Sequence, residues 1–304
     1  MSEPTAQVDQ SVVGSPANLS FVPTDQVTEE PLTAVGPVTV KVTDGAADLV
    51  ATLTGAVGSD GVLTVTVPAA DLSVLDEYEI EWQATIGHVS QSWTTALEVV
   101  GGFYFTAAQF RALGKEFVST PAENIYALRR LVEGFFERHC HVAFVPRSAR
   151  CVVRGDGTPL LILPHVEVRE IYELVVATPL SGAALALTPT QIAALDQTRL
   201  AKGLLGLPMY GGHWPDVCGR WNRHSFLDMH YAHGKTRVPP TVQNAALRLV
   251  REYVNLDGRV PPRAVLQATE FGNFRISTPG PNTPTGIPDI DEVIQFEKRS
   301  RAVI

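Results

Sequence analysis

Apolar residues between positions 120 and 140 recur at spacings of three and four, which is the period of an amphipathic α-helix. Thr120 is the expected N-cap, Pro121 the first helical residue, and Glu123 the residue that completes a capping box. The apolar positions are Ile125, Leu128, Val132, Phe135 and Phe136, and the polar positions are Glu123, Arg129, Arg130, Glu133, Glu137 and Arg138. The pattern predicts a helix with one buried face and one charged face, ending at His139-Cys140-His141.

A second amphipathic helix is predicted over residues 242–254, after Pro239-Pro240-Thr241. We expect it to pack on the first helix, because each has a single apolar face to bury. The expected core residues are Ile125, Leu128, Val132, Phe135, Cys140, Phe144, Leu249 and Tyr253. Two shorter helices are predicted, one after Thr106 as N-cap and one beginning at Asp289.

Residues 35–100 follow a different period, because apolar and polar residues alternate there as they do in half-buried strands. The alternating segments are 38–42, 49–53, 62–67, 77–84 and 91–99, separated by turn residues such as Asp44-Gly45 and Asp60-Gly61. Strands at such short intervals predict a β-sandwich of immunoglobulin-like size. Trp82 alternates in register with Tyr78 and Ile80, which favours a core aromatic over a ligand platform.

These periods predict an α+β multidomain protein. Its expected parts are an N-terminal arm over 1–34, an immunoglobulin-like β-sandwich over 35–101, a helical core over 102–262 with a β-rich insertion at about 148–235, and an extended C-terminal arm with a short helix over 263–304. Residues 1–34 are assigned to an arm because they are rich in Pro, Ser, Thr and Gln. Gly155-Asp156-Gly157 is the expected turn of a hairpin between Cys151–Arg154 and Leu160–Leu163. The tail from Val260 is expected to be irregular.

Charge is divided unevenly between the two parts of the chain. Residues 1–101 hold fourteen acidic residues against Lys41 alone, a net charge of −13, while residues 102–304 hold 23 basic and 18 acidic residues, a net charge of +5. These values add up to the net charge of −8 for the whole chain. An acidic first part repels DNA, so sequence-specific binding of nucleic acid is not expected.

Composition excludes several classes of protein. No run of eighteen apolar residues and no secretory signal is present, so we expect a cytosolic protein without a membrane span. The three cysteines, Cys140, Cys151 and Cys218, are odd in number and irregularly spaced, which favours buried thiols in a reducing compartment over a disulfide framework.

The candidate metal ligands are His139, Cys140, His141, His213, Cys218, His224, His230 and His233. Their spacing matches no zinc motif, because neighbouring histidines at a helix end or on a strand point in different directions. No Gly-x-Ser-x-Gly nucleophile motif occurs, and Asp289 and Asp291 are explained as helix-capping residues. We therefore expect no catalytic site, no metal and no cofactor.

Three segments resemble a known family, the head-to-tail adaptor or connector proteins of long-tailed bacteriophages, particularly those that infect actinobacteria. The first is Leu131-Val132-Glu133 leading to Cys140-His141-Val142-Ala143-Phe144-Val145-Pro146-Arg147, the second is Tyr231-Ala232-His233-Gly234 followed by Pro239-Pro240 and the helix 242–254, and the third is Thr285-Gly286-Ile287-Pro288-Asp289-Ile290-Asp291. They occur in the family's order and cover roughly residues 103–147 and 228–304. His141 departs from the family, which has a small residue there, and the β-sandwich at 35–100 is an addition to the minimal adaptor.

The resemblance implies a structural virion protein, not an enzyme. It implies a homo-oligomeric ring, twelvefold in the family, at the neck between the portal protein and the tail-side connector or stopper protein, through which double-stranded DNA passes during genome ejection. The chain would be in host cytoplasm during assembly and in the virion afterwards. The implied portal or subunit docking residues are Thr285, Gly286, Ile287, Pro288, Asp289, Asp291 and Phe296. We expect deletion of residues 278–304 to leave a folded subunit that fails to join heads to tails.

Two other functions remain open from the residues. A surface- or carbohydrate-binding β-sandwich protein would use Trp82 or Trp93, and a metal-dependent hydrolase would use His230 or His233.

Overall fold

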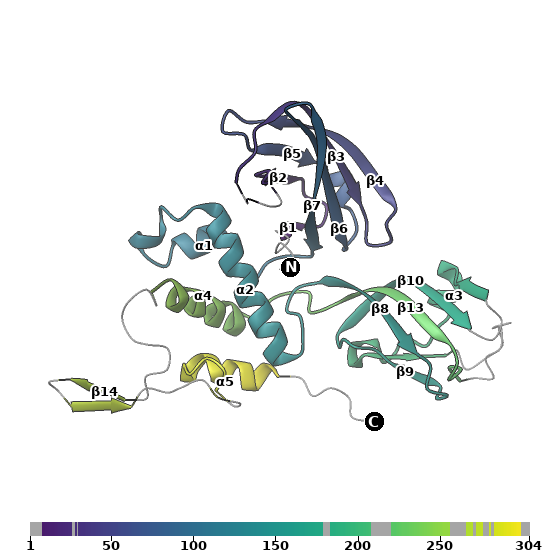
Figure 1. Cartoon of the computed structure of the whole chain (residues 1–304). Helices are drawn as coiled ribbons and strands as arrows, with labels where there is room; N and C mark the ends of the chain where they lie inside the picture. Colours follow the sequence, from purple (N-terminus) through teal and green to yellow (C-terminus); the bar gives the residue numbers. More distant parts are fainter. Residues whose placement is uncertain are drawn as a thin grey trace. The chain divides into compact units, whose positions relative to one another are not determined.

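The computed structural model describes residues 8–25, 28, 30–178, 183–207, 220–255, 266–269, 272–275, 280 and 283–298. In these residues the chain is an α+β protein with mostly β structure and few helices (Figure 1). It divides into two compact units. The first comprises Met1–Gly102, Pro146–Cys151 and His230–Ala232, and the second comprises Phe103–Val145, Val152–Met229 and His233–Ile304.

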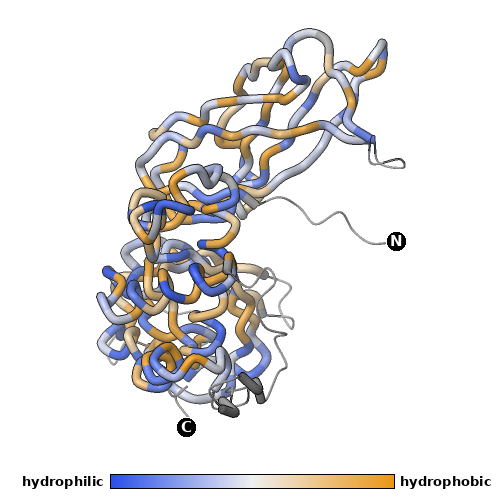
Figure 2. The backbone as a smooth tube through the Cα atoms, turned by 90° about the vertical axis from the view of Figure 1, so that its left-hand side faces the viewer, coloured by the Kyte–Doolittle hydropathy of each residue, from blue (hydrophilic) through white to orange (hydrophobic). Residues whose placement is uncertain are grey.

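The first unit contains a seven-stranded sheet. Its strands are β1 (Val8–Val12), β2 (Ala17–Phe21), β3 (Ala34–Thr43), β4 (Leu49–Val57), β5 (Leu63–Val67), β6 (Glu77–Ile86) and β7 (Val89–Val100), in the order β1-β7-β6-β3-β4-β5-β2. A short 3₁₀ helix, Ala69–Leu72, connects β5 to β6. The five strands predicted between residues 38 and 99 correspond to β3 through β7, and their apolar positions alternate with hydrophilic ones along the chain (Figure 2).

Alternate side chains of these strands form the core of the sandwich. Val40, Ile80 and Leu97 are fully buried, and so is Trp82, whose Nε1 donates a hydrogen bond to Thr95 Oγ1 at 3.0 Å. The prediction that Trp82 is a core aromatic is therefore confirmed. Pairing of buried Trp82 with a neighbouring hydroxyl satisfies its only polar atom, as buried indoles require.

The N-terminal residues differ from the unpacked arm that composition predicted. β1 pairs in parallel with β7, and β2 pairs antiparallel with β5. Ala17 and Leu19 point into the core at alternate positions of β2. Five-residue strands of mixed composition are too short to stand out in the sequence, but hydrogen bonding to an existing sheet edge stabilises them.

A polar network lies at one end of the first unit. The buried carboxylate of Asp76 accepts a hydrogen bond from Arg150 Nη2 at 3.0 Å and backbone N–H groups from Gly45 and Glu77, and His230 Nε2 lies 3.5 Å from it. Arg147 forms an ion pair with Glu98, which also accepts a hydrogen bond from Gln10. These contacts attach segments 146–151 and 230–232 to the unit that contains residues 8–102. Sequence periodicity gave no signal for them.

The second unit contains helices α1 (Ala107–Arg111), α2 (Ala122–Cys140), α4 (Pro240–Asn255) and α5 (Pro288–Glu297), with a 3₁₀ turn at Lys115–Phe117. Thr106 caps α1, because its hydroxyl accepts the Gln109 N–H while the Gln109 side chain accepts the Thr106 N–H. The start of α2 differs from the prediction, since its N-cap is Pro121 and no side chain caps it. In the described part of the chain, no helix is long and apolar enough to cross a membrane.

The remaining strands form smaller sheets. β8 (Arg147–Arg154), β10 (Val168–Thr178), β11 (Ala183–Ala186) and β13 (Phe226–His233) form a four-stranded sheet in the order β11-β10-β13-β8, while β9 (Leu160–Ile162) pairs with β12 (Leu204–Gly206). A short helix α3 (Pro189–Ala193) lies between β11 and β12 in the sequence. β14 (Leu266–Thr269) and β15 (Gly272–Arg275) form a hairpin in the tail that was expected to be irregular.

The predicted hairpin at Gly155-Asp156-Gly157 is wrong, because β8 and β9 belong to different sheets. Instead the Gly155 N–H donates to the Ser225 carbonyl and the Gly157 N–H to the Trp221 carbonyl. A Cβ at position 155 would lie 2.1 Å from the Asn222 carbonyl oxygen, so the glycine permits this close approach of two backbones.

Candidate functional site

The three segments that carry the family resemblance meet in one hydrophobic core of the second unit. From α2 the core takes Val132, Phe136 and Cys140, from α4 it takes Val242, Ala246, Leu249 and Val250, and from α5 it takes Ile290 and Ile294. The Cys140 thiol lies 3.8 Å from the Ile294 carbonyl oxygen. Helices from three distant parts of the chain therefore depend on one another for burial of their apolar faces.

The expected core residues lie in this cluster at two depths. Ile125, Val132, Cys140, Phe144 and Leu249 are buried, while Leu128, Phe135 and Tyr253 are partly buried and pack against them. Burial raises the pKa of the Cys140 thiol to about 12, and the nearby Glu297 carboxylate adds to that shift. The thiol therefore stays protonated at neutral pH, and it is a packing group and not a nucleophile.

Arg129 and Glu133 were assigned to the charged face of α2, and the structure corrects this. Arg129 is 3% exposed and Glu133 is fully buried. Glu133 Oε1 accepts the backbone N–H of Tyr104 at 2.9 Å and lies 3.9 Å from Arg129 Nε. The Arg129 guanidinium stacks 3.3 Å from the centroid of the Phe103 ring. A carboxylate and a guanidinium are tolerated inside because each has partners there.

The turn before α5 is built around Asp291. Its Oδ1 accepts the Thr285 N–H at 2.9 Å and the Thr285 hydroxyl at 2.7 Å, while the Thr285 oxygen accepts the Ile287 N–H at 3.0 Å. Gly286 adopts a left-handed conformation with φ of 71° inside this turn. Asp291 is only 4% exposed, so it holds the entry of α5 from within.

The predicted docking residues therefore have different surroundings. Pro288, Asp289 and Phe296 are exposed, Thr285, Gly286 and Ile287 are half-buried, and Asp291 is buried. Phe296 is 85% exposed, the largest exposure among the described large apolar side chains. At the ends of α5, Asp289 forms an ion pair with Arg248 of α4, and Glu297 accepts a hydrogen bond from Lys235 at 2.7 Å.

Burial in α5 also bears on the expected deletion of residues 278–304. Ile290 is fully buried and Ile294 is 1% exposed, and both lie in the core with α2 and α4. A chain without α5 would expose that core to water. The expectation that this deletion leaves a folded subunit therefore conflicts with the burial of Ile290 and Ile294.

Of the candidate zinc ligands, His141 and His233 line one pocket of the second unit, and the other described ones lie elsewhere. His139 lies against Phe135, with its Nδ1 2.8 Å from the Phe135 carbonyl oxygen, His230 lies at Asp76, and His224 is exposed. His213 and Cys218 lie outside the described residues. Within the described ranges no three His, Cys, Asp or Glu side chains are placed to hold a metal ion.

Trp82 and Trp93, the residues expected to bind a carbohydrate in the alternative function, do not form an exposed aromatic surface. Trp82 is buried, and Trp93 is 9% exposed with its Nε1 donating to the Thr24 carbonyl oxygen at 3.2 Å. Phe21 packs on both indoles, with ring centroids 5.8 Å and 5.9 Å away. Neither Trp82 nor Trp93 presents a face on which a sugar ring could stack.

No family model and no curated protein matches the chain. Solved structures that resemble it include chains of gene transfer agent (GTA) particles. A chain in the virion of a native particle has 13% identity and a TM-score of 0.44 over 66% of this chain and 92% of that chain, and one in the neck of an empty particle computed with C6 symmetry has 14% identity and a TM-score of 0.40 over the same shares. A chain in the neck of a native particle computed with C12 symmetry has 13% identity and a TM-score of 0.40, covering 65% and 90%. A likeness at this level assigns no function to the chain.

Proposed function

We propose that this chain is a structural protein of the neck of a tailed bacteriophage or a similar particle. In this role, copies of the chain form a ring that joins the portal to the tail-side connector and lets DNA pass. The observation that carries the proposal is the packing of the three family-like segments, around Cys140, Val250 and Ile290, into one core. The helical parts of these segments are far apart in the sequence, yet they bury their apolar residues in one hydrophobic core.

Exposed apolar residues on the same helices support a role in assembly. Phe296 on α5 is 85% exposed, and Tyr126 and Leu131 on α2 are 47% and 55% exposed. Aromatic side chains such as Tyr126 and Phe296 are enriched in protein–protein interfaces. In the proposed ring, α5 supplies a contact to the portal or a neighbouring subunit through Pro288, Asp289 and Phe296.

The net charge of the whole chain does not favour general affinity for DNA. Affinity for DNA without sequence preference comes from Lys and Arg that neutralise phosphates. The chain has a net charge of −8, and its first 101 residues carry −13. In this proposal the acidic β-sandwich, residues 35–101, is an immunoglobulin-like addition on the outside of the neck, and the part beginning at residue 102 is the adaptor core.

Phage or phage-like particles from a strain whose genome encodes this chain provide the test of the proposal. Mass spectrometry of purified particles is expected to find it in multiple copies, and a strain lacking its gene is expected to accumulate filled or empty heads separate from tails. Complementation with Phe296→Asp should leave heads and tails unjoined, while the exposed control Glu292→Ala should restore joining. Purified particles that lack the chain, or normal joining in the deletion strain, would contradict the proposal.

A further inference from the structure

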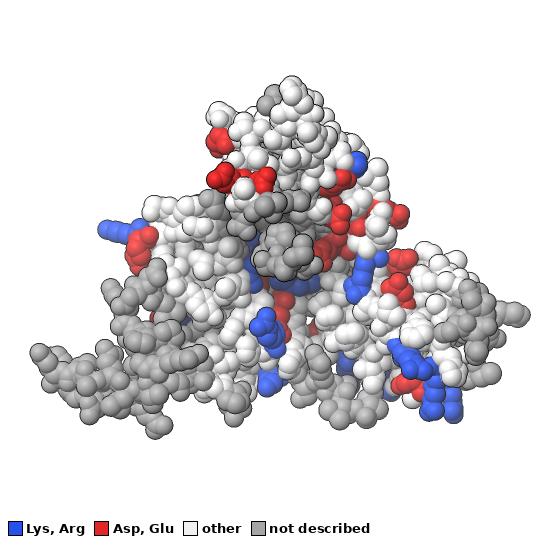
Figure 3. Space-filling view, viewed as in Figure 1, with Lys and Arg blue, Asp and Glu red and all other residues white. Residues whose placement is uncertain are grey.

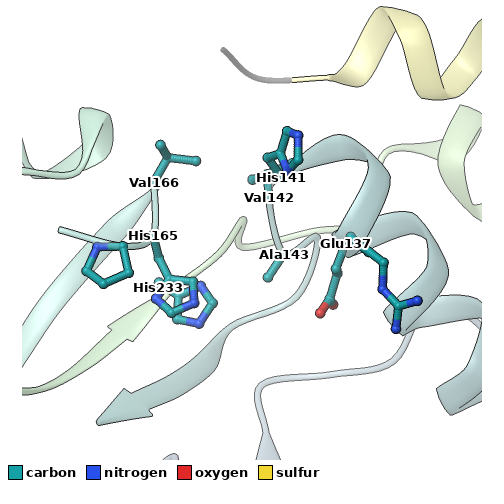
Figure 4. A pocket seen from close by; sticks show the side chains of 9 residues that line it. Glu137, His141, Val142, Ala143, His165, Val166 and His233 are labelled. Atoms are coloured by element: carbon teal, nitrogen blue, oxygen red, sulfur yellow. The ribbon is translucent and has the colours of Figure 1, made fainter. Parts of the chain in front are cut away.

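A pocket of about 400 Å³ opens in the second unit beside the C-terminal end of α2. Three of the eight histidines of the chain line it: His141 after α2, His165 before β10 and His233 at the end of β13. The rings of His165 and His233 stack with centroids 4.0 Å apart, and Figure 4 shows them on one side of the pocket, with His141 and Glu137 on the other. The volume is within the range of small-ligand sites in proteins.

The hydrogen-bond donors of this lining favour an anion. Arg138 joins the three imidazoles, and the one carboxylate in the lining, Glu137, already accepts a hydrogen bond from the Tyr104 hydroxyl at 3.2 Å. An imidazole has two nitrogens, so one can serve a protein neighbour while the other faces a ligand. Arg is always charged and binds carboxylates with paired donors.

The pocket also has apolar walls, formed by Val142, Ala143, Pro164 and Val166. An isolated anion uses only the polar part of such a site. A segment that carries a carboxylate next to aliphatic side chains uses both parts, because Arg138 and the imidazole N–H groups can bind the carboxylate while the walls exclude water from its apolar groups. The lining therefore fits a peptide in which an acidic residue lies next to apolar residues.

The chain itself displays a segment of this chemistry where the β3–β4 loop enters β4. Asp48 is exposed, Leu49 is 60% exposed and Val50 is 37% exposed. The preceding loop is held in shape by Asp44, whose Oδ1 accepts the Ala46 N–H at 2.9 Å and the Asp48 N–H at 3.0 Å. A loop that is already ordered loses little conformational freedom when it binds.

The net charges of the two parts of the chain also favour contact between the pocket and the loop. The pocket belongs to the part of the chain with a net charge of +5, and the loop belongs to the part with −13. In the view of Figure 3 the seven-stranded sheet, at the top, carries many red acidic side chains and few blue ones. Complementary charge favours contact between unlike surfaces of two copies, which is the heterologous arrangement that closes into a ring.

We propose that this pocket receives Asp48-Leu49-Val50 of a second copy of the chain, with the Asp48 carboxylate at Arg138 and the histidines. The inference rests on the proposed function, since it assigns one contact within the proposed ring. It gives the acidic β-sandwich a role in linking neighbouring subunits, and it gives His141 a role at the position where the family has a small residue.

Photo-cross-linking in assembled particles tests the contact. Pro164, an exposed residue of the pocket lining, is replaced by p-benzoylphenylalanine in the full chain so that Arg138 is kept, and Arg251, an exposed arginine of α4, is replaced in a control. Irradiation is expected to give a covalent dimer from position 164, with Asp48–Val50 in the cross-linked peptide, and no such peptide from position 251. A cross-link from position 164 to another protein, to another segment, or within one chain would overturn the inference.

A charge exchange provides a second test. Arg138→Glu and Asp48→Arg are each expected to lower incorporation of the chain into particles about tenfold, because like charges then face each other. The two changes in one chain should restore incorporation, and Arg251→Glu should change it less than about twofold. Failure of the double variant to recover, with folding shown intact by circular dichroism, counts against the contact. Particles without the chain would overturn the proposed function as well, whereas a ring with cross-links elsewhere would overturn only this inference.

Discussion

Replacement of Glu133 by alanine is expected to destabilise the second unit strongly. Glu133 is fully buried, and its carboxylate accepts the Tyr104 N–H at 2.9 Å. A buried donor left without its acceptor costs about 1–3 kcal/mol, and breaking a buried ion pair such as that with Arg129 costs about 3–5 kcal/mol. These costs overlap, because one carboxylate serves both partners, so we expect a loss of about 3–5 kcal/mol.

Urea denaturation followed by circular dichroism measures this loss, and hydrogen exchange of the α2 amides assigns it to the second unit. Glu292→Ala, an exposed change on α5, is the control and should alter the free energy of unfolding by less than about 0.5 kcal/mol. The double variant Arg129→Met, Glu133→Leu removes both charges and should recover much of the stability. A loss below about 1 kcal/mol for Glu133→Ala would refute the reasoning, since it would mean that the buried groups need no mutual compensation.

The remaining predictions concern the ends of helices, the core and pH. Ile294→Ala should cost about 2–5 kcal/mol of unfolding free energy because a buried side chain is lost, whereas Phe296→Ala on the same helix should leave thermal stability unchanged; equal effects of the two would contradict the assignment of faces on α5. Thr106→Ala should cost about 1 kcal/mol by removing the capping box with Gln109, as urea denaturation would measure. Burial, reinforced by Asp76, Asp44 and Asp71, raises the pKa of Tyr78 to about 12 from its usual 10. Because the folded state favours the neutral phenol, stability should fall as pH rises from 10 to 12, and Tyr78→Phe should weaken this dependence in pH-dependent melting.

Periodic burial made much of the secondary structure predictable. The β-sandwich strands bury every second residue, and α2 and α4 bury residues three and four apart, so the pattern of residue types follows the pattern of burial. The segments expected at 77–84 and 242–254 correspond to Glu77–Ile86 and Pro240–Asn255 in the structure. Differences of this size at the ends of elements are normal, because capping and fraying determine the end residues and periodicity does not.

Features that depend on distant partners were not predictable in the same way. Arg129 and Glu133 have charged side chains, which normally indicate a solvent-facing position, and only the approach of Phe103 and Tyr104 makes their burial tolerable. Pairing of β8 with β13, in place of a local hairpin, depends on strand neighbours that no short-range pattern specifies. Burial was therefore predictable where a segment's own residue pattern specifies it, and it was not predictable where a remote residue determines it.

In the candidate site, too, the motif was visible in the sequence but the contacts of its residues were not. The Thr285–Asp291 motif was noted in the sequence, yet only its hydrogen bonds reveal that Asp291 supports the turn from inside while Phe296 faces solvent. The stacking of His165 on His233 left no trace in the sequence, since the two lie in separate segments without a common motif. The pocket could have been predicted only if the spatial neighbours of His165 had been known.

The most direct test of the central claim is a cryo-electron microscopy reconstruction of the neck of particles that encode this chain. We expect a ring of density between portal and tail in which each subunit fits α2, α4 and α5 packed around Cys140 and Ile294. We also expect the exposed Phe296 to contact the portal or a neighbouring subunit. A neck ring built from a different protein, with this chain absent from the particle, would contradict the account.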